Sequence, residues 1–445
     1  NLMGHFNTLT FLFFIILFSG GIQAQVVWTE PAFPTQDDLV TLYYNVSEGN
    51  EALLDVNEPC PGCPFVFAHT GVITAESTSS SNWLHVHNPW PSTSPNNLSE
   101  ANFGNVLVPV DALVHSFNFG GLTLAEYYGI NEGEQIEQLA FVFRDVLGTV
   151  VGKNADESDI FVAISNGQYE VDFVNPPLDF NLMNVGEELT IQAISSDWGE
   201  LTLSINGVEV ASNEGLAIEY TFSLDEAGDY AISVNGVSAT DDEDEKGVAI
   251  TALPNTPNIA WPPSGTVDGI NYLNDSTVIL QVFAPYKDFV FAVGDFNGWE
   301  MNSAAVMHRT PDYQRYWIEL SGLQPELPYR FQYHILPDDI RVADAYAEIQ
   351  LDKWNDPWIP ESTYPEMIPY PIEFTSGDPV SVFVTGEDEY VWSDNGFARP
   401  EQENLVIYEI LVRDFSEQRT YKLIEDSLDY LEDLGVTAIE LMPIM

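Results

Sequence analysis

The stretch that decides the fold is NLVIYEILVRDFSEQRTYKLIEDSLDYLEDLGVTAIELMPIM, residues Asn404–Met445. Its first part, Leu405–Arg413, is an almost unbroken apolar and aromatic run, which is typical of a strand buried on both faces. A helical pattern follows, because apolar residues recur on one side of a 3.6-residue wheel. Thr420 is placed to cap this helix and Gly435 to end it, and a second buried run covers Val436–Met442. The stretch therefore predicts a strand–helix–strand unit with parallel strands.

Two blocks in this stretch resemble the alpha-amylase family, glycoside hydrolase family 13. GVTAIELMPI (Gly435–Ile444) is similar to the family's second-strand block, and LVIYEILVRDFS (Leu405–Ser416) is similar to its first barrel strand. The resemblance implies an eight-stranded β/α barrel whose active site lies at the C-terminal ends of the strands. A generic strand–helix–strand unit of some other α/β enzyme is the alternative.

Residues 400–445 would supply only the start of such a barrel, which typically needs about 250 residues. We therefore expect a reading frame cut at its C-terminus. The resemblance places the nucleophilic Asp, the acid/base Glu and a second Asp on later strands, so no catalytic residue is assigned in this chain. We expect the 445 residues to be inactive as an enzyme. No cofactor is expected in them, and calcium in the missing part of the barrel is left open.

The N-terminal residues 1–24 predict a signal peptide. Phe11–Phe18 forms a compact apolar core, and the small residues after it fit cleavage behind Ala24. A core of this length is too short to span a bilayer, which takes about 20 apolar residues. We expect a secreted or cell-surface protein with no membrane span.

The charge balance is strongly acidic. Asp and Glu number 69 against 13 Lys and Arg, giving a net charge of −56, and the acids are spread along the whole chain. Such a surface argues against nucleic acid and anionic membranes as partners, and salt would screen its self-repulsion. Hydrophobic residues make up 45% of 445 positions, so several separate cores are expected.

The chain has two cysteines, Cys60 and Cys63, in the sequence EPCPGCPF. A C-x-x-C pair in a cytosolic protein would suggest a redox or metal site. In an exported protein, a small local disulfide that closes a loop is the favoured interpretation, with metal binding as the alternative.

Residues 26–165 predict a β module with a starch-binding role. The predicted strands are Leu39–Asn45, Phe65–His69, Gln138–Asp145 and Asp159–Ile164. FVFAHTGVITAESTSSSNWLHV (Phe65–Val86) weakly resembles starch-binding modules of multidomain bacterial amylases. Trp83 and Trp90 lie among polar residues, where an exposed indole can stack on a sugar ring. The alternative is that both close a small core under the loop.

Residues 173–253 predict an immunoglobulin-like β-sandwich that acts as a spacer. Short alternating strands separated by glycine turns carry this signal. The predicted strands are Glu188–Ile194, Leu201–Ile205, Ala217–Phe222, Asp229–Val234 and Gly247–Ala252. The acidic run Asp241–Glu245 lacks the alternate spacing of a calcium loop and is interpreted as a solvated hairpin.

Residues 258–390 contain VFAVGDFNGWEMN (Val290–Asn302) and LPYRFQYHI (Leu327–Ile335). They resemble carbohydrate-binding module family 48, an early-set β-sandwich with the motif G-x-F-N-x-W. In binding members, the motif tryptophan and a basic residue face the glucan, which would be Trp299 and Arg330 here. In enzyme-attached members, the same tryptophan often packs the module on the barrel.

The sequence thus predicts a mostly β chain: tandem immunoglobulin-like β-sandwich modules, then the first βαβ unit of a truncated TIM (β/α)8 barrel. The resemblance implies the N-terminal part of a secreted glycosidase that hydrolyses α-glucosidic bonds of starch- or glycogen-type glucans with retention. The expected partner is an α-glucan polysaccharide, and the oligomeric state is left open. The alternatives are a branching or debranching enzyme of the same family, a non-catalytic cell-surface starch-binding protein, and an adhesin with immunoglobulin-like repeats.

Overall fold

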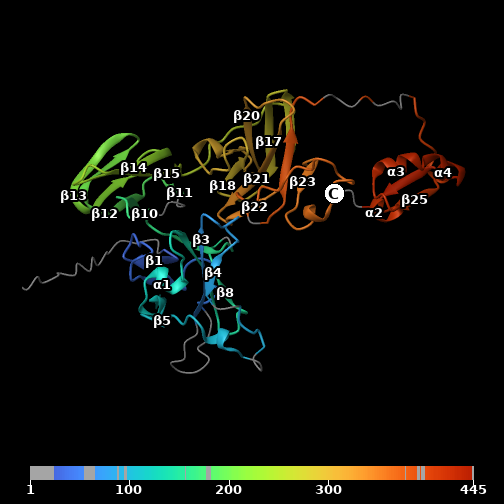
Figure 1. The fold of residues 1–445 in the computed structure, drawn as a ribbon. Coiled ribbons are helices and arrows are strands. Elements are labelled where there is room, and N and C mark those ends of the chain that lie inside the picture. The colour runs from blue at the N-terminus through green and yellow to red at the C-terminus, as the bar shows by residue number, and fades with distance from the viewer. Residues whose placement is uncertain are drawn as a thin grey trace, which may run out of the picture. The chain divides into compact units, whose positions relative to one another are not determined.

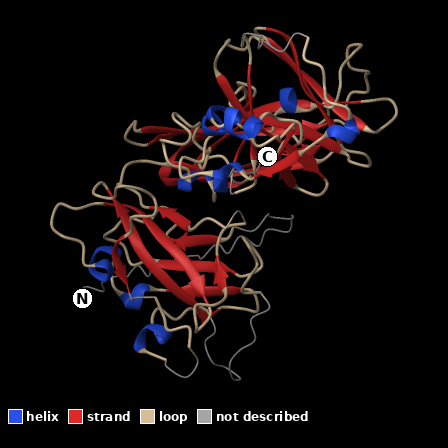
Figure 2. Ribbon diagram, turned by 90° about the vertical axis from the view of Figure 1, so that its right-hand side faces the viewer, coloured by secondary structure: helices blue, strands red, loops and turns tan. Residues whose placement is uncertain are grey.

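The computed structural model describes residues 25–54, 66–87, 90–94, 98–155, 157–176, 182–375, 377–387, 391 and 396–442. Strands dominate these residues, and the helices are short (Figures 1 and 2). The mostly β fold class is therefore confirmed. The chain divides into two compact units, residues 1–254 and 255–445. The signal peptide and the cysteines Cys60 and Cys63 lie outside the described residues.

The first module contains two antiparallel sheets. One sheet has the strand order β1-β2-β6-β5, and the other has the order β4-β3-β7-β8, with β9 also paired to β7. One helix, α1 (Leu124–Tyr128), is capped by Thr123. The strands are β1 (Val27–Glu30), β2 (Thr41–Asn45), β3 (Phe67–Thr74), β4 (Leu84–His87), β5 (Val108–Pro109), β6 (Val114–Phe117), β7 (Ile136–Arg144), β8 (Val151–Gly152) and β9 (Ile160–Ala163).

Apolar residues on alternate positions of these strands form one core, as the period-two pattern of strands requires. Within it, the rings of Tyr44 and Phe143 stack with centroids 3.8 Å apart. At the end of β7, Arg144 is 1% exposed. Its guanidinium donates to the carbonyls of Ala101 (2.7 Å) and Asp145 (3.0 Å). Backbone carbonyls therefore accept the hydrogen bonds of a buried cation.

The second module forms one continuous network of strands in the order β10-β12-β14-β15-β11, with β13 paired to β12. The long strand β12 runs through the place where the sequence predicted two strands, with a register irregularity between Ile194 and Gly199. Strands β11 and β15 are parallel, whereas the other pairs are antiparallel. The strands are β10 (Val171–Asn175), β11 (Leu182–Asn184), β12 (Glu188–Ile205), β13 (Val208–Ser223), β14 (Gly228–Ser238) and β15 (Glu243–Leu253).

The third module has two antiparallel sheets that share one core. Sheet one has the order β16-β17-β20-β19, and sheet two has the order β18-β21-β24-β23, with β22 paired to β21. The strands are β16 (Gly269–Asn274), β17 (Thr277–Phe283), β18 (Phe289–Gly294), β19 (His308–Arg309), β20 (Arg315–Ser321), β21 (Pro328–Leu336), β22 (Ile340–Val342), β23 (Ile349–Leu351) and β24 (Val380–Val384).

Gly294, the first residue of the G-x-F-N-x-W motif, lies where two chain segments approach closely. A Cβ atom at this position would lie 2.4 Å from the carbonyl oxygen of Arg330 and 2.8 Å from Cβ of Phe331. Both atoms belong to strand β21, which pairs with β18. The motif glycine is therefore required by the pairing of these strands.

The last stretch forms the predicted parallel strand pair with helices between its strands. β25 (Ile407–Ile410) pairs in parallel with β26 (Ala438–Leu441), and α2 (Val412–Phe415), α3 (Tyr421–Asp426) and α4 (Leu428–Asp433) lie between them. Thr420 caps α3 by accepting a hydrogen bond from the Leu423 amide, and Gly435 has a φ of 85°. Both terminus predictions are confirmed.

The burial of Leu405–Arg413 on both faces, which a complete barrel would provide, is not seen in this structure. Strand β25 is shorter than predicted, and of its residues only Ile410 is buried. The core of the segment consists of Ile410, Ile424 and Leu431. No further described strand pairs with β25 or β26, so most apolar side chains of this pair meet solvent. Two strands do not make a barrel, so the (β/α)8 barrel stays a prediction.

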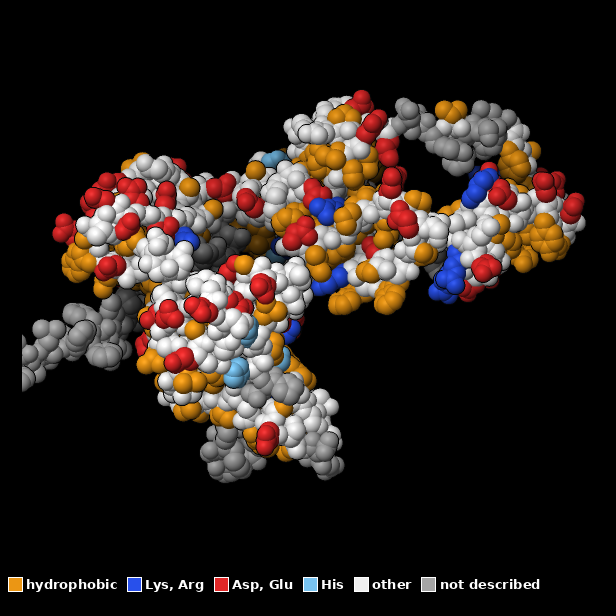
Figure 3. All heavy atoms as spheres, in the orientation of Figure 1, with side chains coloured by type: hydrophobic (Ala, Val, Ile, Leu, Met, Phe, Trp, Pro, Cys, Tyr) orange, Lys and Arg blue, Asp and Glu red, His pale blue; other side chains and the backbone are white. Residues whose placement is uncertain are grey.

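Acidic side chains are spread over the described surface. Figure 3 shows red Asp and Glu atoms on every part of the visible face and only scattered blue Lys and Arg atoms. This agrees with a net charge of −56 that is distributed along the sequence. Of the helices in the described ranges, none has the length and apolar character needed to cross a bilayer.

Candidate glucan-binding sites

Trp83 and Trp90, the two sugar-stacking candidates from the sequence, both have their rings in contact with the ring of His69. The ring of His69, on strand β3, lies 5.6 Å from that of Trp83, with an interplanar angle of 27°. It lies 5.1 Å from the ring of Trp90, with an angle of 79°. Because strand residues alternate between faces, His69 points away from Ala68, which belongs to the module core. The two tryptophans therefore belong to a single aromatic group on the outer face of the β3–β7 sheet.

A fourth ring, that of Phe161 on β9, extends this group. Its centroid is 6.4 Å from that of Trp83, with the planes at 80°. Phe161 is the strand partner of Ala140, and Ala140 is the strand partner of Gly71. A Cβ atom on Gly71 would lie 3.1 Å from Cβ of Trp83, so a small residue here is needed for the indole to fit. We call Phe161, Trp83, His69 and Trp90 the aromatic cluster.

Local contacts fix both indoles. Nε1 of Trp83 donates a hydrogen bond of 3.0 Å to the carbonyl of Ser80, and the Trp90 indole lies against Gly148. Trp90 is 42% exposed and Trp83 is half-buried. Neither belongs to the buried core of the first module. An aromatic surface that is partly open and held in place can stack on a sugar ring, which is the chemistry predicted for these residues.

Strand β4, which follows Trp83, is anchored by two histidines. His85 has a φ of 47°, and its Nε2 lies 2.9 Å from Oε1 of Glu134. The ring of His87 stacks on that of Tyr127 at 4.1 Å, and its Nε2 lies 2.6 Å from the Tyr127 carbonyl oxygen. The hydrogen bond from His85 is the main reason that the pKa of Glu134 is lowered. These contacts fix the strand that carries the cluster, which sequence spacing alone did not indicate.

The second predicted pair, Trp299 and Arg330, is joined by Asp295. The indole Nε1 of Trp299 donates to Asp295 (3.0 Å), and Arg330 donates through Nε (2.9 Å), Nη2 (3.0 Å) and its backbone amide (2.8 Å). Trp299 is only 6% exposed, and its ring stacks on Phe374 at 5.7 Å with an angle of 5°. The structure therefore places both side chains in contacts inside the third module, and packing of Trp299 on a barrel stays an untested alternative. Glucan binding by them stays a prediction, and it would need Phe374 to move.

Asp295 is the residue of this group that sequence reasoning missed, although it is the x that follows glycine in the motif. Burial by itself would raise the pKa of its carboxyl group. The hydrogen bonds from Arg330 and Trp299 outweigh burial, so the pKa of Asp295 is lowered overall. The carboxylate is thus ionised near neutral pH and organises the tryptophan and the arginine around it.

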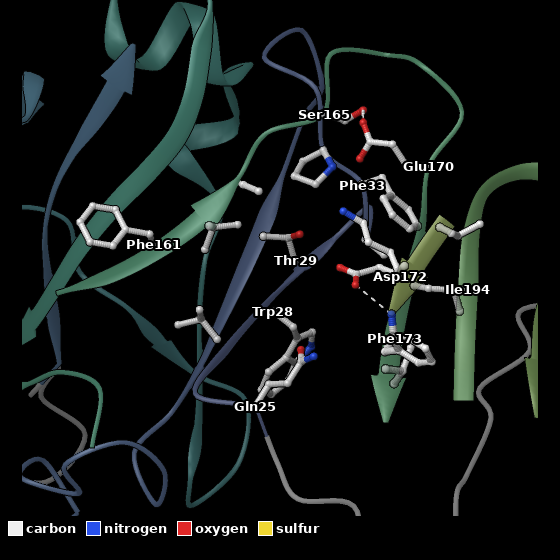
Figure 4. A pocket seen from close by; sticks show the side chains of 18 residues that line it. Gln25, Trp28, Thr29, Phe33, Phe161, Ser165, Glu170, Asp172, Phe173 and Ile194 are labelled. Carbon is white, nitrogen blue, oxygen red and sulfur yellow. Dashed lines mark hydrogen bonds between the residues drawn. The ribbon is translucent and has the colours of Figure 1, made fainter. Parts of the chain in front are cut away.

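A cavity of 690 Å³ in the first unit is lined by residues from segments far apart in the sequence. Figure 4 shows Trp28, Phe33 and Asp172 around it, and a hydrogen bond of 2.8 Å from the Phe173 amide to Asp172. Burial raises the pKa of Asp172. Phe161 lines this cavity and also belongs to the aromatic cluster. Sequence spacing could not indicate this cavity, because strand pairing brings its walls together.

Metal binding has no geometric support in the described part of the chain. Within those residues, no three or more His, Cys, Asp or Glu side chains are grouped closely enough to hold a metal ion. The alternative metal site at Cys60 and Cys63 lies outside the described residues. The candidate sites are therefore aromatic and hydrogen-bonding surfaces.

Parts of the chain are similar in sequence to known enzymes. The chain is 36% identical over 108 residues to a malto-oligosyltrehalose trehalohydrolase of Saccharolobus solfataricus, covering 24% of this chain and 17% of that protein. It is 27% identical over 170 residues to a 1,4-alpha-glucan branching enzyme GlgB of Corynebacterium jeikeium, covering 38% and 21%. It is 37% identical over 67 residues to a chloroplastic isoamylase 1 of Arabidopsis thaliana, covering 13% and 9%. The chain is similar, over part of its length, to α-glucan enzymes.

These matches reach about a fifth of the relatives' lengths or less. No protein-family profile matches the chain. Among solved structures, a pullulanase of Klebsiella pneumoniae complexed with maltotriose covers 88% of this chain and 42% of its own, at 14% identity and a TM-score of 0.28. A TM-score of this size carries no argument about function. The partial sequence similarity is therefore the comparison that bears on this chain.

Proposed function

We propose that this chain is the N-terminal part of a secreted glycosidase of the alpha-amylase family, acting on starch- or glycogen-type α-glucans. The observation that carries the proposal is the similarity to the trehalohydrolase and the branching enzyme. The two sequence blocks at Leu405–Ser416 and Gly435–Ile444 agree with it, and so does the parallel pairing of β25 and β26. The proposed reaction is retaining hydrolysis by a carboxylate nucleophile and a carboxylic acid/base, about 5 Å apart.

The proposed role of the 445 residues themselves is to bind the polymer through the aromatic cluster. The rings of Trp83 and Trp90 both contact that of His69 and keep part of their surface open. Each stacked sugar ring contributes little, so one module is expected to bind with a dissociation constant of about 1 mM, or about −4 kcal/mol. A polymer that engages two modules at once binds more tightly, because the second contact is intramolecular.

Native electrophoresis in gels containing amylose tests the binding role. The parent chain is expected to be retarded, and Trp83→Ala and Trp90→Ala are each expected to reduce the retardation. Trp198→Ala in the second module is the matched control, because that indole is 57% exposed and lies outside the aromatic cluster defined above. Equal mobility of the parent with and without amylose would reject polymer binding. Circular dichroism spectra of all variants show whether each has kept its fold.

A branching or debranching enzyme is a second candidate, because a glucan branching enzyme and an isoamylase are among the relatives. Assays of a protein that contains the complete proposed barrel decide between these activities. Release of short α-anomeric oligosaccharides from amylose, followed by NMR, is expected for a retaining amylase. Formation of new α-1,6 linkages would instead identify a branching enzyme. A protein that binds glucan without any turnover would be a surface starch-binding protein.

A further inference from the structure

A pocket at one end of sheet one of the third module has the features of a binding site, and it is separate from the aromatic cluster and from the Trp299–Arg330 pair. Its volume is 590 Å³. The lining side chains that matter for its chemistry are Trp261, Asp268, Gln281, Thr310, Asp312 and Arg315. Trp299 and Arg330 belong instead to sheet two and its adjoining motif. We call this pocket the Trp261 pocket.

Trp261 is presented by a chain segment that is tied to the sheet just before it. Nε1 of Trp317 donates 2.9 Å to the carbonyl of Ala260, and the Ala260 amide donates 3.0 Å to the carbonyl of Arg309. Pro262 follows, and its ring restricts the backbone. Trp261 itself is 62% exposed. A large aromatic face is thus held on a fixed backbone while its surface stays open to solvent.

The wall of the pocket is built from a network of planar polar side chains. Asp268 accepts hydrogen bonds from Nε of Arg315 (2.7 Å), from its Nη2 (3.0 Å) and from Nε2 of Gln281 (2.9 Å). Gln281 is 4% exposed. Its Oε1 atom has no hydrogen-bond partner among the described residues. A buried amide oxygen without a partner is costly, unless a ligand or water donates to it.

A second carboxylate borders the same space. Asp312 accepts a hydrogen bond of 2.6 Å from the hydroxyl of Thr310, and the Thr310 hydroxyl also receives the Arg315 amide. The pocket therefore offers two carboxylates as acceptors, and one guanidinium that is already paired with Asp268. An anionic ligand such as a phosphate would meet net repulsion from these groups. A purely apolar ligand would cover these carboxylates without donating a hydrogen bond to them.

We propose that the Trp261 pocket is a second subsite for α-glucan, in which a glucose ring stacks on Trp261. Its hydroxyl groups donate to Asp312. A neutral, polyhydroxylated ligand fits the pocket because it supplies donors without adding charge. It also offers an apolar ring face to the indole. The choice of α-glucan among such ligands rests on the proposed function, whereas the existence of the subsite rests on the pocket.

Isothermal titration of the full chain with maltoheptaose tests the proposal. The background is the double variant Trp83→Ala/Trp90→Ala, so that the aromatic cluster contributes nothing. This background is expected to keep measurable binding. Adding Trp261→Ala is expected to weaken it at least tenfold, and adding Asp312→Ala several-fold. The matched control is Trp358→Ala, an indole of the same unit that is 85% exposed and lies outside the pocket; it is expected to change nothing.

The possible outcomes separate this inference from the proposed function. Loss of all binding in the double variant, with binding by the parent, would overturn the Trp261 subsite and leave the aromatic cluster as the site. Equal effects of Trp261→Ala and Trp358→Ala would also overturn it. A parent chain that does not bind maltoheptaose at all would overturn both proposals. Equal affinity for cellohexaose would overturn the assignment to α-glucan.

Discussion

Replacing Asp295 by Asn should strongly destabilise the third module. The substitution keeps the shape of the side chain but removes the charge that accepts four hydrogen bonds from Arg330 and Trp299. In asparagine, an NH2 group replaces one carboxylate oxygen. It then faces N–H donors of Arg330 or Trp299, and the hydrogen bonds to that oxygen are lost. Removing one partner of a buried ion pair costs about 3–5 kcal/mol. The Asp295 and Arg330 side chains are 22% and 19% exposed, so water compensates in part. We expect a loss of about 2–4 kcal/mol.

Differential scanning calorimetry of the full chain measures this loss. At about 3 °C per kcal/mol for a unit of this size, the transition of residues 255–445 is expected to fall by about 6–12 °C. The matched control is Asp338→Asn, which removes the partner of Lys287 in the same module. That pair is 30% and 44% exposed, so its loss should cost less than about 1 kcal/mol. Equal shifts for the two variants would refute the role given to Asp295.

The pH dependence gives an independent check. The pKa of Asp295 is lowered in the folded chain, against an unfolded value of about 3.9. A carboxylate with a lowered pKa contributes stability above the unfolded value, and that stability is lost as the pH falls through the folded value. The difference in melting temperature between the parent and Asp295→Asn should therefore be constant near neutral pH. It should shrink well below pH 4. A difference that grows on acidification would contradict the reasoning.

Three further perturbations test other parts of the structure. Gly294→Ala should lower the free energy of unfolding by about 1–3 kcal/mol, because its Cβ would overpack against β21. Gly247→Ala should be nearly neutral, because its Cβ would lie 3.7 Å from the nearest atom. Calorimetry measures both variants. Arg144→Lys should lower stability by about 1–3 kcal/mol, because one ammonium group cannot reach the Ala101 and Asp145 carbonyls that the guanidinium spans; an unchanged urea midpoint would count against this. Adding sodium chloride up to about 0.5 M should raise the melting temperature, since salt screens the net charge of −56, and a steady decrease would argue against self-repulsion.

Local signals in the sequence were sufficient to predict local structure. Thr420 and Gly435 act through hydrogen bonds and backbone conformations within a few residues, so the ends of the helical segment between β25 and β26 could be predicted. The burial of Leu405–Arg413 could not be predicted, because an apolar run does not say what covers it. The break predicted between Ile194 and Leu201 was wrong. Strand β12 continues through that region as an irregularity: Ser195 pairs with Val171 of β10, pairing with β13 resumes at Gly199, and pairing with β14 begins there.

For the candidate sites too, single residues could be selected from the sequence, but their spatial grouping could not. Trp83 and Trp90 could be selected from their polar neighbours, but their meeting at His69 depends on the register of β3, β4 and β7. The G-x-F-N-x-W motif could be recognised, yet the burial of Trp299 depends on Phe374, which comes much later in the chain. Trp261 is followed in the sequence by Pro262 and Pro263, and neither neighbour indicates a site. Only the fold brings Trp261 next to Asp268 and Gln281.

The parallel pairing of β11 with β15 has a mechanical consequence for the second module. β11 comes early in that module and β15 ends it, and the two strands lie side by side in the same direction. Once β10 has detached, tension applied from both ends of the module pulls these strands along each other. Their three residue pairs, from Leu182–Thr251 to Asn184–Leu253, are then loaded together in shear rather than opened one by one. If one end of the chain is bound to an insoluble granule and force is applied to the other, the β11–β15 pair is therefore the part of this module that resists extension after β10 has detached.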